Sequence, residues 1–149
     1  MRNIAFFLTP KSSVVYVTPN MTLRQAIEKM ENHRYKSISI LTEDGGYYGV
    51  LTEGDILWQM KRNPDLNFKN TEKIRIEDVP RYWKYDPVSI SEDMDSLIRV
   101  AEMQSFVPVV DDTGIFIGII RRSDILNYCY SHMAVSDETS GADKPVPAT

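Results

Sequence analysis

The chain of 149 residues is long enough for one compact domain or two small halves that share a core, and its 42% hydrophobic content can build that core. A formal net charge of −4 argues against a broad nucleic-acid surface, since phosphate binding relies on clustered lysine and arginine. The single cysteine, Cys129, excludes an internal disulfide.

Neither a membrane segment nor an enzyme active site is predicted. The apolar run near the N-terminus is too short for a signal peptide or a membrane span, so we expect a soluble, cytoplasmic protein without a membrane partner. Cys129 lies beside tyrosines and is expected to be a small hydrophobe, since His33 and His132 are isolated. We find no nucleophile beside a base and no Cys/His cluster, so we expect no catalytic residues, no metal and no cofactor.

The first predicted elements are a strand and a helix. Residues 14–17 are β-branched and aromatic, which favours a strand, and residues 18–20 end it. Thr22 is predicted as a helix N-cap because Gln25 follows three residues later, the spacing of a capping box. Apolar residues at helical spacing continue to Met30, which indicates an amphipathic helix.

A hairpin and a second helix complete the first unit. Alternating isoleucines predict a strand over residues 37–41, residues 43–46 form a turn, and residues 47–51 return as a strand. Residues 52–55 then open a second helix. The order of elements is β-α-β-β-α.

The second half repeats this order. Its predicted strands cover residues 88–90, 107–110 and 115–120, and its predicted helices cover residues 95–103 and 123–128. From the hairpin onward the copies align 69 residues apart (Gly45 with Gly114), whereas the first strand and helix align better at 73 (Val15 with Val88). The second copy is therefore expected to have lost four residues, about one helical turn, and to have a first helix that ends early.

The organisation of the chain follows from the repeat. We predict a first repeat over residues 1–60, a polar linker over 61–73, a second repeat over 74–132 and a disordered tail over 133–149. Each repeat starts with a short lead-in, residues 3–10 in the first and 74–80 in the second.

One motif occurs in both copies. Residues 49–55 read GVLTEGD and residues 118–124 read GIIRRSD, each followed by Ile-Leu. The motif, the repeated element order and an apolar Val-Pro-Val-Val strand together resemble the CBS-domain family in its tandem arrangement, the Bateman module. The resemblance implies an α/β (α+β) fold of two β-α-β-β-α repeats packed with pseudo-two-fold symmetry. A looser likeness, carried by residues 78–81 and 118–122, is to stand-alone bacterial CBS proteins that bind cyclic di-AMP.

The resemblance also implies a function. CBS pairs bind adenine nucleotides such as AMP, ATP or cyclic di-AMP in two clefts, commonly form homodimers and signal to a partner protein. We therefore expect a regulatory nucleotide sensor whose protein partner the sequence leaves unidentified. A structural dimerisation module without a nucleotide ligand is the alternative, and a transcription regulator would need a DNA-reading element that is not visible here.

The first motif suggests how one cleft binds a nucleotide. Thr52 offers a hydroxyl where a strand meets a helix, and the helix N-terminus attracts a phosphate. Asp55 is placed to accept hydrogen bonds from the hydroxyls of a ribose. The alternative is structural, because threonine is an ordinary N-cap residue and aspartate is favoured in the first turn of a helix.

The second motif replaces the hydroxyl with a charge. Arg121 and Arg122 supply guanidinium groups that bind phosphate bidentately, and Asp124 occupies the position of Asp55. We expect this cleft to prefer a more anionic ligand or to receive phosphates from the first cleft. Alternatively, both arginines are solvated surface charges near two aspartates, and Asp124 is a helix-start residue with Ser123 as a competing cap.

Strands and lead-ins supply the remaining candidate ligand-binding residues, which are Thr9, Pro10, Ser37, Ile38, Ser39, Arg81, Phe106, Val107 and Pro108. Thr9 and Pro10 from the first lead-in and residues 37–39 from the first repeat's strand are the candidates for an apolar adenine slot with polar groups at its edge. Ser39 stands where the second copy has Pro108, and it keeps a backbone N–H that proline lacks. Arg81, in the stretch RYWKY, either stacks on a base, packs over the cleft mouth or belongs to a dimer interface.

Overall fold

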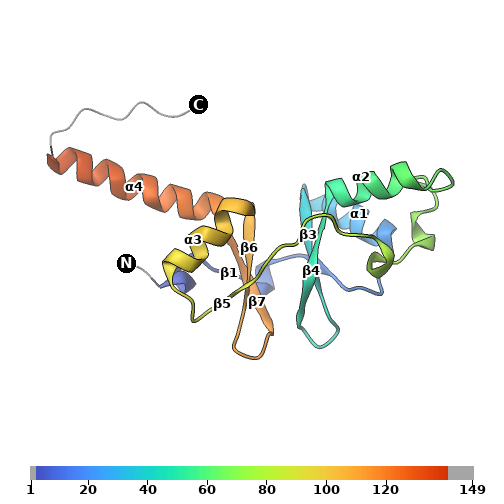
Figure 1. The fold of residues 1–149 in the computed structure, drawn as a ribbon, viewed down its shortest axis with the longest axis horizontal. Helices are drawn as coiled ribbons and strands as arrows, with labels where there is room; N and C mark the ends of the chain where they lie inside the picture. Colours follow the sequence, from blue (N-terminus) through green and yellow to red (C-terminus); the bar gives the residue numbers. More distant parts are fainter. Residues whose placement is uncertain (1–2, 141–149) are drawn as a thin grey trace.

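The computed structural model describes the backbone of residues 3–140 and the side chains of residues 3–133 (Figure 1). The first half consists of the 3-10 helix η1 (Ile4–Phe7), β1 (Thr9–Pro10), η2 (Lys11–Ser13), β2 (Tyr16–Val17), α1 (Leu23–His33), β3 (Ser37–Leu41), β4 (Tyr47–Thr52) and α2 (Glu53–Arg62). The second half consists of η3 (Thr71–Lys73), η4 (Ile76–Asp78), β5 (Val88–Ser89), α3 (Met94–Met103), β6 (Phe106–Val110), β7 (Phe116–Arg121) and α4 (Arg122–Ser140). This order confirms the mixed α/β fold with two β-α-β-β-α units.

Two small sheets form the centre of the molecule. In the first sheet, β3 pairs in parallel with β2 and antiparallel with β4. In the second, β6 pairs in parallel with β5 and antiparallel with β7, and β1 adds a fourth strand beside β7. Helices α1 and α2 lie on the outer side of the first sheet, and α3 and α4 lie on the outer side of the second (Figure 1). The inner sides of the two sheets therefore face each other.

The two hairpin turns meet and relate the halves by pseudo-two-fold symmetry. The Tyr47 N–H donates to the Gly114 carbonyl at 3.3 Å, and the Phe116 N–H donates to the Gly45 carbonyl at 3.0 Å. The two bonds are equivalent, because Tyr47 and Phe116 are counterparts 69 positions apart, and so are Gly45 and Gly114. A hydrophobic cluster that includes Phe116 fills the space between the sheets. The predicted symmetric packing of two repeats is therefore present.

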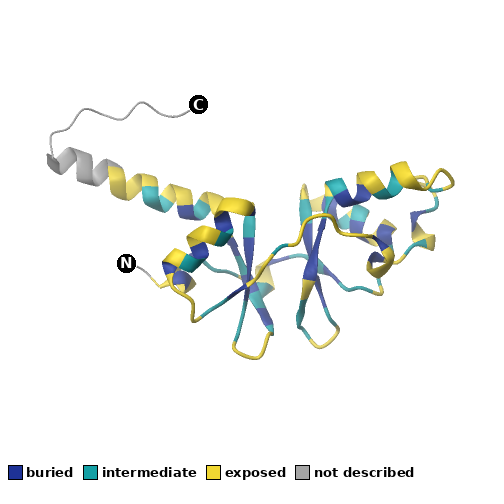
Figure 2. Ribbon diagram, viewed as in Figure 1, coloured by how far each residue is buried: buried dark blue, intermediate teal, exposed yellow. Residues whose placement is uncertain are grey.

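Each lead-in packs against the other repeat. Ile4 and Phe7 of η1 lie in the hydrophobic core under α3 and α4. Ile76 and Val79, at η4, lie in the core under α1 and α2. The buried residues concentrate along the strands and the inner helix faces, whereas the outer helix faces and turns are exposed (Figure 2). Because each core borrows a segment from the other half, the two repeats are interlocked.

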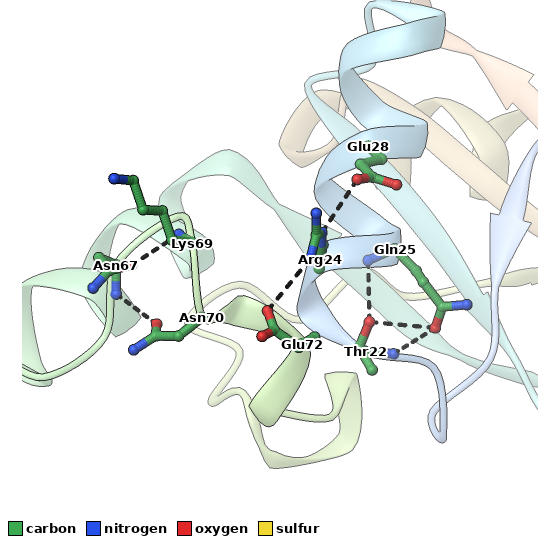
Figure 3. Close-up of polar contacts among 8 residues, drawn as sticks. All are labelled: Thr22, Arg24, Gln25, Glu28, Asn67, Lys69, Asn70 and Glu72. Atoms are coloured by element: carbon green, nitrogen blue, oxygen red, sulfur yellow. Dashed lines mark hydrogen bonds and ion pairs between the residues drawn. The ribbon is translucent and has the colours of Figure 1, made fainter.

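The capping box predicted for the first helix is confirmed (Figure 3). Thr22 Oγ1 accepts the Gln25 N–H at 3.2 Å, and Gln25 Oε1 accepts the Thr22 N–H at 2.8 Å. In the first turn of α1, Arg24 lies 3.4 Å from Glu28 and 3.7 Å from Glu72 of the linker. The linker predicted as irregular over residues 61–73 instead begins with the end of α2 and ends with η3, and through Glu72 it contacts the first helix.

The offset between the two copies corrects the sequence alignment. Val17 pairs with Ile40 as Val88 pairs with Val109, and Val17 and Val88 are 71 positions apart, not 73. The buried residues of the two helices keep this offset: Leu23, Ala26 and Met30 in α1, and Met94, Leu97 and Ala101 in α3. Since the hairpins align at 69, the second copy has lost two residues instead of four. The offset of 73 came from matching apolar side chains, whereas burial and strand pairing fix it at 71.

The missing residues lie at the end of the first helix and in the loop after it. Helix α1 has 11 residues and α3 has 10, so α3 ends early as predicted, but by one residue only. Three residues, beginning with Arg34, separate α1 from β3, and two, Gln104 and Ser105, separate α3 from β6.

Other boundaries differ from the sequence prediction. Strand β2 covers only the second half of residues 14–17, because Val14 caps η2 and its N–H donates to the Lys11 carbonyl. Helix α4 continues to Ser140 and so overlaps the tail predicted over residues 133–149, of which residues 141–149 lie outside the described part. None of the helices described between residues 3 and 140 is both long and apolar enough to cross a membrane.

Candidate functional site

A cavity of about 410 Å³ lies between the two repeats, where the end of α1 and strand β3 face the start of α4. It is lined by Val14, Val15, Arg34, Tyr35, Lys36, Ser37, Ser39, Ser105, Phe106, Ile119, Arg121, Arg122, Ser123 and Leu126. A cavity of this size, with mostly apolar walls and a few polar groups, suits a small-molecule ligand.

The cavity has a cationic rim. Arg34 and Lys36 come from the first repeat, and Arg121 and Arg122 come from the second. All four side chains are exposed, and none of the described lining residues is a carboxylate. Within the described part of the chain, the ion pairs involve Arg24 and none of these four cations. Arg122 Nη1 donates to the Ala101 carbonyl at 3.4 Å, but no carboxylate among the described lining residues competes for the rim, which can therefore bind an anionic group from solution.

Arg34 reaches the rim through an uncommon backbone conformation. It caps α1 with φ 58° and ψ 38°, and it is the one non-glycine residue with positive φ in the described part of the chain. Its N–H donates to the Glu31 and Met30 carbonyls, which closes the last turn of the helix. A left-handed conformation costs a residue with a Cβ atom about 1–2 kcal/mol. The fold thus accepts local strain at the position that places Arg34 beside the cavity.

Five of the candidate ligand-binding residues line this cavity: Ser37, Ser39, Phe106, Arg121 and Arg122. They come from β3 of the first repeat and from β6, β7 and α4 of the second. The structure therefore brings the first repeat's serine strand together with the second repeat's motif.

Other candidates lie outside the lining. The side chains of Ile38 and Val107 belong to the two hydrophobic cores. Pro108 is buried on β6. Thr9 and Pro10 form β1, which runs along β7 next to the cavity. For these five residues, a contact with ligand stays a prediction from the sequence.

Thr52 and Asp55 form a capping box at the start of α2. Thr52 Oγ1 accepts the Asp55 N–H at 3.1 Å, and Asp55 Oδ2 accepts the Thr52 N–H at 3.0 Å. Asp55 Oδ1 accepts a third bond, from the Tyr82 N–H at 2.8 Å, and the residue is 0% exposed. The structure therefore shows the helix-start arrangement that the sequence left as the alternative, and the ligand role of both residues stays a prediction.

The second motif is arranged differently. Asp124 is half-buried, its carboxylate has neither a hydrogen bond nor an ion pair to any other described residue, and it is not in the cavity lining. Asp111, a neighbouring acid considered for Arg121, instead closes its own turn: it accepts the Thr113 hydroxyl at 2.8 Å. That hydrogen bond lowers the pKa of the Asp111 carboxyl below its ordinary value. Asp111 is therefore not the counter-ion of Arg121.

Arg81 packs over the first repeat and does not line the cavity between the repeats, so the three arrangements considered for it stay predictions. Its guanidinium lies over the Tyr48 ring, 4.7 Å from the centroid, and donates to the Tyr48 carbonyl at 3.2 Å. The same group fills the space above Gly49, where any Cβ atom would overlap it. At the matching Gly118, the backbone of Thr9 occupies that space. In both copies the motif glycine thus lies under a segment that crosses it: β1 at Gly118, and Arg81, the residue after the second lead-in, at Gly49.

Nearby, Tyr47 is half-buried under the chain that follows Arg81. Its Oη donates to the Tyr85 carbonyl at 2.5 Å. Burial raises the pKa of Tyr47 above its ordinary value, and the positive charge of Arg81 offsets part of that rise. The phenol is therefore held in its neutral, hydrogen-bonded form.

Sequence reasoning missed the loop after the first helix. Arg34, Tyr35 and Lys36 all line the cavity, but no motif marks them. The available signal was a pair of cations directly after a predicted helix end and before a strand that carries two serines. Among the described residues, no group of three His, Cys, Asp or Glu side chains is arranged to hold a metal ion.

Comparison with known proteins places this geometry in context. A CBS domain-containing protein of Dictyostelium discoideum is 26% identical over 122 residues, which is 77% of this chain and 83% of that protein. The solved structure of CbpB in complex with c-di-AMP has a TM-score of 0.78 at 18% identity, covering 95% of this chain and 91% of that one. The structure of CBSX2 in complex with AMP has a TM-score of 0.70 at 19% identity, covering 89% and 99%. At these identities the solved structures establish a shared fold.

The family itself is established by sequence. The pattern of the CBS domain matches residues 5–62 and again residues 76–131, which together span most of the chain. The two matches coincide with the two interlocked β-α-β-β-α units, so this chain belongs to the CBS-domain family, as a tandem pair of CBS domains.

Proposed function

We propose that this CBS pair is a regulatory module that binds an adenine nucleotide of the AMP, ATP or cyclic di-AMP class and signals binding to a partner protein. The observation that carries the proposal is the cavity between the repeats, with its apolar wall and its rim of four cations. The complexes of CbpB with c-di-AMP and of CBSX2 with AMP support this ligand class. CBS domains are generally regulatory, and no catalytic family is indicated.

Each part of a nucleotide has a matching surface in the cavity. An adenine ring is planar and largely apolar, and Phe106 and Ile119 offer apolar surface to pack against it. Ser37 and Ser39 offer hydroxyls to the ring edge or the sugar. Phosphate groups are expected at the rim, where Arg121 and its neighbouring cations supply charge-assisted hydrogen bonds.

The rim suggests how binding becomes a signal. Arg34 and Lys36 belong to one repeat, whereas Arg121 and Arg122 belong to the other. A ligand held by both pairs links the repeats and favours one relative orientation of them, which is a population shift. The partner protein would then recognise that orientation. Four cations also favour a ligand with two or more phosphate charges over one with a single charge.

Calorimetry and thermal unfolding with AMP, ATP and cyclic di-AMP test the proposal. A nucleotide at a hundredfold excess over its Kd stabilises the folded state by about 2.7 kcal/mol, which raises Tm by roughly 5–11 °C at this chain length. Arg121→Gln and Lys36→Gln should each weaken binding about tenfold or more. Lys69→Gln, an exposed cation in the linker, is the control and should leave affinity unchanged. Absence of heat and of any Tm shift with all three nucleotides at millimolar concentration would refute the proposal.

We also propose that a second copy of the chain covers the outer faces of α2 and α4. Leu57 and Trp58 on α2, and Tyr130 and Met133 on α4, are exposed apolar residues at the surface of the two helices. Apolar groups gathered on a surface in this way mark interfaces. The structural alternative, dimerisation without a nucleotide ligand, rests on the same residues.

Sedimentation equilibrium distinguishes these possibilities. Wild type is expected to be a dimer, and Leu57→Asp is expected to be a monomer. Met103→Asp places the same charge on an exposed residue of α3 and should leave the dimer intact. A monomeric wild type would exclude the homodimer, whereas a dimer that binds none of the three nucleotides would favour the structural alternative.

A further inference from the structure

The segment of residues 81–86, here called the strap, crosses the first repeat at the side where α2 begins. It is held there by several contacts. The Tyr82 N–H donates to Asp55 Oδ1, Arg81 donates to the Tyr48 carbonyl, and Tyr47 Oη donates to the Tyr85 carbonyl.

The other side of the strap is held by the second repeat. The Asp86 N–H donates to Gln104 Oε1 at 2.7 Å, and Gln104 Nε2 donates back to the Asp86 carbonyl at 3.1 Å. The Tyr85 ring lies 5.2 Å from the Phe106 ring, and its hydroxyl lies 3.4 Å from the Ser105 hydroxyl. The strap is therefore fixed at both ends and is not a free surface loop.

The contact at Asp55 is the informative one. A carboxylate at this position could accept two hydrogen bonds from the hydroxyls of a ribose. Both oxygens already have backbone donors, Thr52 N–H on Oδ2 and Tyr82 N–H on Oδ1, and the residue is 0% exposed. A ribose can reach Asp55 only if the strap leaves. A second cavity of about 490 Å³ lies between the strap and β4, but neither Thr52 nor Asp55 lines it.

The second repeat offers the opposite situation. The carboxylate of Asp124, 69 positions after Asp55, has no hydrogen-bond or ion-pair partner among the described residues. At the offset of 71 the segment that corresponds to the strap is residues 10–15, which contain η2. Its Val14 N–H donates to the Lys11 carbonyl and its Val15 N–H to the Tyr35 hydroxyl, and no described N–H of the segment donates to Asp124. The open cavity with the cationic rim begins beside this motif, at Arg121 and Arg122.

We propose that the strap is the resident ligand of the first repeat, so that the chain takes one nucleotide, at the cavity beside the second motif, and not two. In this arrangement the Tyr82 N–H takes the position on Asp55 that a ribose hydroxyl would take. The proposal rests on the proposed function for its nucleotide stoichiometry, but the seating of the strap is a property of the ligand-free protein.

A pair of substitutions at one position isolates the hydrogen bond. Tyr82→Pro removes the N–H that occupies Asp55, because proline has no amide hydrogen. Tyr82→Ala removes the same ring, with its contact to Arg62, but keeps the N–H. Titration with cyclic di-AMP and with AMP by calorimetry should give one site per chain in wild type and in Tyr82→Ala, and two sites in Tyr82→Pro. Two sites in wild type, or a single site in Tyr82→Pro, would overturn the proposal.

Hydrogen exchange tests the strap without any nucleotide. In the ligand-free protein the Tyr82 amide should be protected on the order of 100-fold or more relative to an unstructured amide. Asp55→Asn should reduce that protection at least about tenfold, since a charge-assisted bond is replaced by a weaker neutral one. A Tyr82 amide that exchanges freely in wild type would show that the strap is not seated, whatever nucleotides bind. A protected amide in a protein that binds no nucleotide would instead remove the proposed function and leave the strap in place as a structural element.

Discussion

The two glycines of the repeated motif test how the segments that cross them, β1 and Arg81, are held. An alanine methyl group at Gly118 would overlap the Thr9 carbonyl oxygen and lie 3.1 Å from the Pro10 Cα atom. Both are backbone atoms of β1, so they can move away only if that strand separates from β7. A methyl group at Gly49 would overlap the guanidinium of Arg81, which is the end of a flexible side chain. The same substitution therefore meets a rigid neighbour in one copy and a mobile one in the other.

The expected costs differ accordingly. Gly118→Ala combines overpacking strain of about 1–3 kcal/mol with weakened backbone bonds along β1, at about 1 kcal/mol each. Gly118 also has φ 156°, a conformation that side chains with a Cβ atom rarely adopt, which adds to the cost. A loss near 3 kcal/mol lowers Tm by roughly 6–12 °C for a chain of this length. Gly49→Ala lets Arg81 swing out and loses its contact with the Tyr48 ring and carbonyl, which is about 1 kcal/mol. That corresponds to roughly 2–4 °C.

Urea denaturation and calorimetry of both variants measure this difference. Combining Gly49→Ala with Arg81→Ala provides the control, because the methyl group then has no guanidinium to displace. The double variant should be no less stable than Arg81→Ala alone. The effect of Gly49→Ala would then depend on whether Arg81 is present, which is the coupling between neighbours that a double-mutant cycle measures. Equal losses for Gly118→Ala and Gly49→Ala would refute the argument from the two crossing segments.

Three further outcomes follow from single residues. Burial raises the pKa of Tyr47 in the folded state, so its contribution to stability is complete below the unfolded pKa near 10 and is lost above it, by up to about 1.4 kcal/mol per pH unit. Tyr47→Phe should remove this loss of stability with rising pH, measured by urea titrations at alkaline pH. An unchanged slope would contradict the assignment to Tyr47. Arg34→Gly should raise the free energy of unfolding by up to about 1 kcal/mol, because glycine adopts the left-handed conformation without strain. The same variant should bind nucleotide more weakly in calorimetry. A variant less stable than wild type would contradict the strain argument. Arg121→Thr should let the threonine hydroxyl cap α4 and bond with Asp124, adding about 1 kcal/mol of stability. Arg121→Val, whose side chain has the shape of threonine without the hydroxyl, should add none. Equal Tm values for the two variants would contradict the comparison.

Much of the fold could be predicted because its signals are local. The capping box at Thr22 needs only a hydroxyl and an amide three residues apart. The alternation in residues 37–41 predicts a strand that the structure contains with the same bounds. The offset between the copies was harder, since side-chain similarity favours 73 and only strand pairing and burial reveal 71. Pairing between distant segments is not written in either segment alone.

The site was predicted less completely, and the reason is chemical. A hydroxyl followed three residues later by an acid serves a helix N-terminus as well as it serves a nucleotide. The pattern at Thr52 and Asp55 therefore fits both roles, and the contact that ties up the acid comes from Tyr82, 27 residues away. The cationic loop at Arg34 and Lys36 was not anticipated because its position depends on how one repeat faces the other. Two of the rim's four cations, Arg121 and Arg122, were found because they belong to a motif.

One replacement between the copies changes two properties together. Thr52 caps α2 and engages Asp55, so the first motif is satisfied within the protein and its acid is buried. Arg121 has no side-chain acceptor, so the capping box of the first copy has no equivalent in the second, and Asp124 keeps a carboxylate without a partner among the described residues. The same arginine adds a charge to the cavity rim. A loss of helix capping and a gain of anion binding thus come from one side chain, which is why the repeat with the weaker helix start is the one we assign to nucleotide binding.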